Sequence, residues 1–141
     1  MSDLQRAIRI LKEGEYTCAI VKGESVHTST LRGVKPLMQY LKRNTDLKDA
    51  CAADRVVGKA TAFLYVLLQV KAVYARVMSE SALQVLWKHH VQTDAEHIVP
   101  YIINRKRDGM CPFEEAVLAL DAPQEALAAI EKKMEQLGIE L

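Results

Sequence analysis

Cysteine, aromatic residues and excess charge are all scarce in this chain of 141 residues. Its three cysteines, Cys18, Cys51 and Cys111, are an odd number at wide spacings, and no Cys-x-x-Cys, His-x-Glu or His-x-x-x-His pattern occurs. The cysteines therefore predict neither a disulfide framework nor a zinc site, and we expect no metal and no cofactor. With 19 basic and 18 acidic residues, the net charge of +1 provides no strong field to attract nucleic acid or an anionic membrane.

Long apolar segments are also missing. The longest run, residues 60–70, is interrupted by Thr61 and Gln69 and is far shorter than the ~20 residues that span a bilayer. The first residues, MSDLQR, contain no apolar stretch typical of a signal peptide. We therefore expect a protein of the reducing cytoplasm with no membrane partner. The loop sequence of Arg105, Lys106 and Arg107 is basic, but sparse aromatics argue against an extended nucleic-acid surface.

The composition that remains is that of a folded domain, with 50% hydrophobic and 26% charged residues. No internal repeat, low-complexity segment or linker divides the chain. The sequence predicts a single domain over residues 1–141, with residues 122–141 as a C-terminal helical extension.

The first third of the chain predicts a helix, a hairpin and a second helix. Apolar residues recur at helical spacing between Ser2 and Gly14. Residues 16–21 are rich in β-forming types and lead through a Lys-Gly-Glu turn into a weaker strand at residues 25–29. Gly33 then precedes a helix over residues 34–42, in which a proline is tolerated in the first turn.

From residue 51 onward, predicted strands and helices alternate. The strands are expected at residues 51–57, 72–78 and 98–103, and the helices at residues 59–68, 80–89, 112–120 and 123–137. Pro100 places the last of these strands at a sheet edge. Ser79 is expected to cap the helix that follows it. Such alternation is typical of an α/β fold with parallel strands and right-handed crossovers.

The most informative chemical pattern is a strand followed by Gly and then Lys in the first turn of a helix. It occurs once at Gly33 and Lys35 and again at Gly58, Lys59 and Thr61. A helix N-terminus offers free N–H groups and partial positive charge, glycine admits a ligand close to the backbone, and lysine adds a charge. Side by side at one sheet edge, the two turns form an anion site. The alternative is two ordinary tight turns.

Three further residues are candidates for chemistry. Arg105 is positioned to close over a phosphate, and Asp54 to orient a hydroxyl or a base, although a salt bridge with Arg55 or Lys59 is an equal alternative. Cys111 is a candidate nucleophile, because a thiol at a helix N-terminus beside basic residues is favoured as the thiolate. The alternative is a cysteine that packs beneath a solvated loop.

Several phrases resemble those of a small prokaryotic family of uncharacterised proteins. They are GVKPL at residues 33–37, ADRVVGKA at 53–60, VMSE at 77–80, PYIINR at 100–105 and DGMCP at 108–112. The resemblance covers roughly residues 3–121. It implies an α/β, cytidine-deaminase-like three-layer sandwich, in which a mixed sheet with an N-terminal hairpin and parallel strands is flanked by helices. It implies no assigned activity.

The resemblance also bears on metal chemistry. Zinc deaminases need a His or Cys followed by x-Glu at the start of one helix, and Pro-Cys-x-x-Cys at the start of the next. By order of elements these places are residues 33–35 and 58–61, which contain neither the ligands nor the glutamate. We therefore expect no zinc-dependent deamination, with lysine supplying positive charge in place of the metal.

The sequence leaves three functions open. The leading hypothesis is binding of a phosphate-bearing small molecule, a nucleotide or nucleotide-sugar. The residues expected to contact it are Gly33, Lys35, Asp54, Gly58, Lys59, Thr61 and Arg105. The second hypothesis is an enzyme of unknown reaction with Cys111 as nucleophile. The third is a protein-interaction module, including a homo-oligomer, in which the helix at residues 123–137 packs on a partner; we favour its packing on the domain itself.

Overall fold

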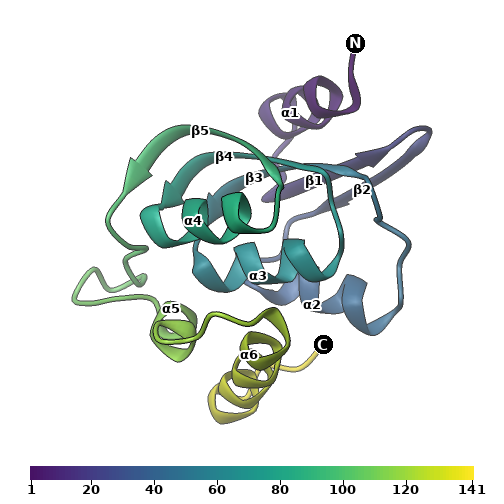
Figure 1. Ribbon diagram of the computed structural model, residues 1–141. Helices are drawn as coiled ribbons and strands as arrows, with labels where there is room; N and C mark the ends of the chain where they lie inside the picture. Colours follow the sequence, from purple (N-terminus) through teal and green to yellow (C-terminus); the bar gives the residue numbers. More distant parts are fainter.

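The computed structural model describes residues 1–141 and shows a five-stranded sheet with helices on both faces (Figure 1). The strands are β1 (Cys18–Lys22), β2 (Ser25–Ser29), β3 (Cys51–Val57), β4 (Ala72–Ser79) and β5 (Gln92–Val99). The helices are α1 (Asp3–Glu13), α2 (Lys35–Lys42), α3 (Lys59–Leu67), α4 (Glu80–Lys88), α5 (Pro112–Val117) and α6 (Pro123–Leu137). The α/β class predicted from the alternation of elements is confirmed.

The sheet is mixed and has the order β2-β1-β3-β4-β5. Strand β1 pairs antiparallel with both β2 and β3, and β3, β4 and β5 run parallel to one another. Gly23 closes the β1–β2 hairpin with a positive φ of 58°, a conformation that glycine adopts without strain. The hairpin therefore occupies one edge of the sheet and the parallel strands the other.

The last strand lies earlier in the chain than the sequence predicts. The expected strand at residues 98–103 is wrong, because β5 covers Gln92–Val99. Most side chains of β5 are exposed, and the strand shows no apolar alternation. It is held to β4 by backbone pairing and by the hydroxyl of Tyr74, which donates a hydrogen bond to Glu96. Pro100 has no N–H group to donate and follows the end of the strand. Residues 100–111 form a loop that contains one bridge, between Ile103 and Met110.

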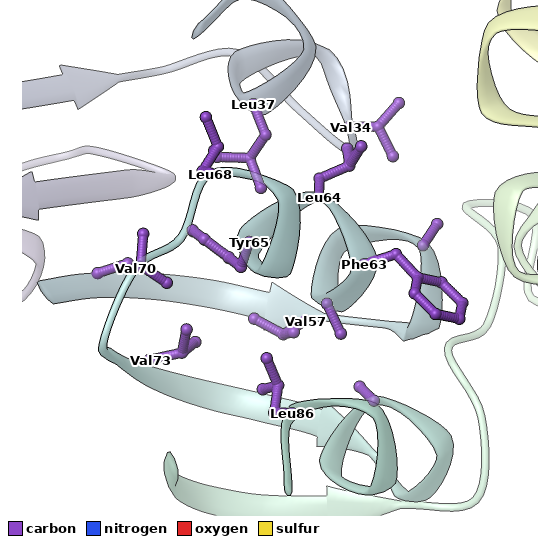
Figure 2. Packing of buried hydrophobic residues seen from close by; sticks show 14 of the residues in the cluster. Val34, Leu37, Val57, Phe63, Leu64, Tyr65, Leu68, Val70, Val73 and Leu86 are labelled. Carbon is purple, nitrogen blue, oxygen red and sulfur yellow. The ribbon is translucent and has the colours of Figure 1, made fainter. Parts of the chain in front are cut away.

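Helix α3 is the centre of the core on one face of the sheet. Its residues Phe63, Leu64 and Tyr65 are fully buried between the strands and the neighbouring helices (Figure 2). A helix that is apolar all round is expected where neighbours cover every side. The packing of α3 therefore places its first residue, Lys59, directly after the end of β3.

The two terminal helices also pack on this framework. Helix α1 covers the opposite face, where Ala7 and Leu11 contact a small cluster that includes Tyr74 (Figure 1). Helix α6 contributes Ala126, Ile130 and Met134 to the main core. The expectation that the C-terminal helix packs on the rest of the chain is therefore confirmed. None of the helices combines the length and hydropathy that a membrane crossing requires.

Candidate functional site

A cavity of about 1070 Å³ lies at the end of β3. Its walls come from the N-terminal ends of α2, α3 and α5, from the loop between β5 and α5, and from the residues at the end of α6. The carboxyl end of a parallel strand beside helix N-termini is the usual place for ligands in open α/β sheets. The two Gly-containing turns of the sequence meet in this one cavity.

Most of the candidate residues line this cavity. They are Gly33, Asp54, Gly58, Thr61, Arg105 and Cys111. The side chains of Lys35 and Lys59 are not part of the lining. Lys35 is half-buried on α2, and Lys59 turns into the protein. The structure thus brings the two glycines together without bringing the two lysines into the cavity.

The ammonium group of Lys59 is used inside the chain. The residue is 9% exposed, and its Nζ donates a 2.8 Å hydrogen bond to the backbone carbonyl of Leu118, just after α5. The same Nζ lies 5.8 Å from the centre of the Phe63 ring, within the range of a cation–π contact. Lys59 therefore links the start of α3 to the end of α5.

The N-terminus of α3 holds a carboxylate that belongs to the chain itself. Oε2 of Glu114, on α5, accepts a 2.6 Å hydrogen bond from the backbone N–H of Lys59. The glutamate is 4% exposed, and its Oε1 has no hydrogen-bond partner. Gly58 makes this approach possible, because a Cβ there would lie 2.6 Å from Oε1.

Opposing effects act on the ionisation of Glu114. Burial raises the pKa of this carboxyl, while the N–H groups of Lys59 and Ala60 and the hydroxyl of Ser79 favour the charged form.

Sequence reasoning missed Glu114, since its partner is 55 positions away in the chain. The available signal was a glutamate in the first turn of α5, where acidic residues are common. Ser79 itself caps α4 as predicted, accepting from the N–H of Ala82 at 3.2 Å.

Asp54 lines the cavity and is hydrogen-bonded to the core. The hydroxyl of Tyr65 donates to its Oδ2 at 2.7 Å, and the N–H of Val56 donates to Oδ1 at 3.3 Å. The Tyr65 oxygen also lies 3.3 Å from Sγ of Cys18. Burial raises the pKa of Asp54 to about 6 even though both hydrogen bonds act to lower it. Because Asp54 forms no ion pair, the alternative of a salt bridge is wrong.

Four basic side chains line the cavity, and none of them forms an ion pair within the chain. They are Arg32, Arg55, Arg105 and Lys106. Sequence reasoning identified Arg105 as a ligand residue but missed Arg32 and Arg55, which adjoin the predicted Gly33 and Asp54. Asp108, also in the lining, is engaged by the side-chain amide of Asn104 at 2.7 Å. The four basic groups thus form no salt bridge, although the carboxyl groups of Asp54, Asp108 and Glu114 also belong to the lining.

Cys111 lies at the N-terminal end of α5 and is half-buried in the cavity wall. Its backbone N–H donates to the carbonyl of Ile102 at 2.9 Å. The chain has no group of three or more His, Cys, Asp or Glu side chains arranged to hold a metal ion.

The fold and cavity define an α/β protein with a mixed five-stranded sheet and a partly apolar cavity that is lined by both basic and acidic side chains. The chain belongs to the TM1506 family, described as a domain of unknown function (DUF1893), which it matches over residues 6–134. This confirms the expected membership of a family of uncharacterised proteins.

The solved structures that match the chain include the following two. A DUF1893 family protein (TM1506) from Thermotoga maritima has 27% sequence identity and a TM-score of 0.86, with 94% of this chain and 91% of that chain covered. A diaminohydroxyphosphoribosylaminopyrimidine deaminase/5-amino-6-(5-phosphoribosylamino)uracil reductase from the same organism has 14% identity and a TM-score of 0.43, with 66% and 35% covered. No curated protein matches the chain.

Proposed function

We propose that the cavity binds a phosphate-bearing small molecule, a nucleotide or nucleotide-sugar, on a cytidine-deaminase-like fold without zinc-dependent chemistry. The observation that carries this proposal is the set of four unpaired basic side chains around one cavity. Arginine recognises phosphate through paired, charge-assisted hydrogen bonds, and Arg32, Arg55 and Arg105 come from three different segments. The cavity volume of about 1070 Å³ suits a molecule of nucleotide size.

The rest of the lining fits the other parts of such a ligand. Apolar side chains form much of the wall, including Leu31, Val34, Ile102, Phe113 and Ile139. An apolar wall of this kind can pack against the flat face of a nucleotide base, which is largely apolar. The carboxyl of Asp54 is placed to accept a hydrogen bond from a sugar hydroxyl or from an N–H of a base.

The start of α2 supports the same proposal. Gly33 adopts a positive φ of 65° before the helix, and no side chain caps the α2 N-terminus. The N–H groups of this helix start, except at Pro36, which has none, therefore remain available beside Arg32, which lines the cavity. A phosphate near Gly33 would meet both backbone and side-chain donors.

The proposal is tested by thermal unfolding and calorimetry with nucleotides, nucleotide-sugars and inorganic phosphate, each nucleotide being paired with its unphosphorylated nucleoside. A ligand at 100 times its Kd is expected to stabilise the fold by about 2.7 kcal/mol. Arg55→Ala and Arg105→Ala should each weaken nucleotide binding about tenfold or more, since each removes a charged hydrogen bond. Arg76→Ala is the matched control, because Arg76 is exposed and lies outside the lining. Equal binding of nucleoside and nucleotide would contradict the proposal.

A second candidate function is favoured by the position of Cys111 in the wall of the same cavity. In this alternative Cys111 is the nucleophile of an enzyme whose reaction is unknown. The test is its rate of alkylation by iodoacetamide at pH 7, with and without a bound nucleotide. A rate equal to that of free cysteine removes the physical basis of a nucleophilic thiol. All three cysteines are free thiols, which fits the proposed cytoplasmic location.

A further inference from the structure

The start of α3 has the properties of an anion-binding site. The helix is nine residues long, and its N-cap residue Gly58 has no side chain with which to cap it. Its N-terminus therefore carries partial positive charge and free N–H groups that need an acceptor from elsewhere. The acceptor is the carboxylate of Glu114, which is 4% exposed and is brought from α5.

We propose that the N-terminus of α3 is the phosphate subsite of the cavity, that Glu114 occupies it as an internal anion, and that the ligand's phosphate displaces this carboxylate. The inference rests on the proposed function, and it specifies where the phosphate binds and what it has to replace. It makes Glu114 an autoinhibitory residue whose removal strengthens phosphate binding.

The first argument is that Glu114 fits the site incompletely. Its Oε2 accepts the N–H of Lys59 at 2.6 Å, but its Oε1 is buried against Gly58 and forms no hydrogen bond, although the N–H of Ala60 and the hydroxyl of Ser79 lie close enough to favour the charged form. A buried carboxylate oxygen without a hydrogen bond is costly. Because Glu114 lines the cavity, its carboxylate regains water there when it leaves the helix.

The second argument is the space that Gly58 leaves at this position. Oε1 and Cδ of Glu114 lie 2.6 and 2.7 Å from the point where a Cβ of residue 58 would stand. The backbone is therefore open to direct contact by the oxygens of an anion. A phosphate has more acceptor oxygens and more charge than a carboxylate, so it can satisfy several N–H groups at the same helix start.

The third argument concerns Lys59, whose Nζ is bound to the carbonyl of Leu118 beyond the same helix, α5. Glu114 and Leu118 are both partners of Lys59, one through its backbone and one through its side chain. A phosphate that replaces Glu114 therefore binds at the backbone N–H of the residue whose ammonium group holds the end of α5. This residue is the lysine that the pattern of residues 58–61 predicts at the anion site.

The test compares Glu114→Gln and Glu114→Ala with wild type, using inorganic phosphate and the nucleotide found in the screen. Glu114→Gln keeps the shape of the side chain and removes its charge, which keeps the test informative where Glu114→Ala fails to fold. Glu115→Gln is the matched control, because it removes a neighbouring but exposed carboxylate from the same helix. Calorimetry gives the affinities, and amide NMR signals of Lys59 and Ala60 report on the helix start directly.

We expect both Glu114 variants to bind phosphate at least about tenfold more tightly than wild type, which corresponds to about 1.4 kcal/mol. Phosphate should shift the Lys59 and Ala60 amide signals, and Glu115→Gln should behave as wild type. Nucleotide binding that is equal in wild type and both Glu114 variants, with unshifted amides, overturns the inference and leaves the proposed function standing. Absence of nucleotide binding to wild type and to both Glu114 variants, with phosphate still bound more tightly by the variants, overturns the proposed function and supports the displacement of Glu114 by phosphate.

Discussion

The hydroxyl of Tyr65 donates a 2.7 Å hydrogen bond to Oδ2 of Asp54 and thereby connects the core of the protein to its cavity. Tyr65 is fully buried on α3, whereas Asp54 lines the cavity from β3. The same hydroxyl lies 3.3 Å from the thiol of Cys18. The ionisation of Asp54 is therefore coupled both to the stability of the fold and to the polarity of the cavity.

The pH dependence of stability should change when Asp54 is replaced by Asn. Burial raises the pKa of Asp54 from 3.8 to about 6 in the folded protein, so the unfolded chain loses this proton first. The native contribution is therefore complete below about pH 4 and is lost as the pH rises to about 6, with a slope of at most about 1.4 kcal/mol per unit.

Urea denaturation of wild type and Asp54→Asn between pH 4 and pH 7 measures this contribution. The free energies of unfolding of the two proteins should diverge with pH, because asparagine is neutral throughout. Glu114, whose pKa is also raised, is present in both proteins, so the difference isolates Asp54. Parallel curves for the two proteins would show that Asp54 titrates normally.

Removing the hydroxyl of Tyr65 should destabilise the protein and make Asp54 still harder to ionise. Tyr65→Phe deletes the shortest hydrogen bond to Asp54, which is expected to cost about 1–2 kcal/mol of unfolding free energy. The pKa of Asp54 should rise further, since that hydrogen bond favours its charged form. Denaturation and carboxyl NMR titration measure the two effects. Tyr16→Phe is the control, because the Tyr16 hydroxyl forms no hydrogen bond, and an equal loss in both variants would contradict the role of Tyr65.

Periodicity and capping residues in the sequence were sufficient to predict the helices and the first four strands. The helix after Ser79, for example, follows from a local N-cap that the structure shows. The strand β5 was misplaced because both its faces carry exposed polar residues, such as Glu96 on one face and His97 on the other. Its pairing depends on the backbone of β4, and backbone pairing leaves little trace in side-chain hydrophobicity. The apolar run after Pro100 therefore outweighed it.

The candidate site was predictable where it depends on local backbone form and not where it depends on distant contacts. Gly33 and Gly58 were identified because a turn before a helix is a local feature. Glu114 reaches the start of α3 from 55 positions away, so no spacing rule connects it to Lys59. Tyr65 belongs to an apolar helix in the sequence, and only the packing of α3 on β3 brings its hydroxyl to a carboxylate.

The contact between Gly58 and Glu114 predicts a strong interaction between substitutions at these positions. Gly58→Ala places a Cβ 2.6 Å from Oε1 of Glu114, a distance at which the carboxylate or the helix has to move. We expect a loss of about 1–3 kcal/mol in the free energy of unfolding. Gly109→Ala is the control, because the nearest atom to its Cβ is 3.8 Å away.

The same contact can be tested by a double-mutant cycle with Glu114→Ala. In that background the side chain that collides with residue 58 is absent, so Gly58→Ala should cost much less. Coupling between contacting residues is typically about 0.5–3 kcal/mol. Additive losses from the two substitutions would mean that Gly58 is required for some reason other than the approach of Glu114.

Helix α6 should be necessary for folding, since its buried face belongs to the main core. Ile130 is fully buried, and Ile130→Ala is expected to lower the free energy of unfolding by about 2–5 kcal/mol. Leu137 lies on the same helix and is 49% exposed, so Leu137→Ala should lower the free energy of unfolding far less.

If residues 1–141 form one domain, as the sequence predicts, removal of residues 123–141 exposes the apolar surface of α3 and abolishes cooperative unfolding in a urea titration. A truncated protein that still unfolds cooperatively, but no longer self-associates, would instead assign α6 to an interface between chains.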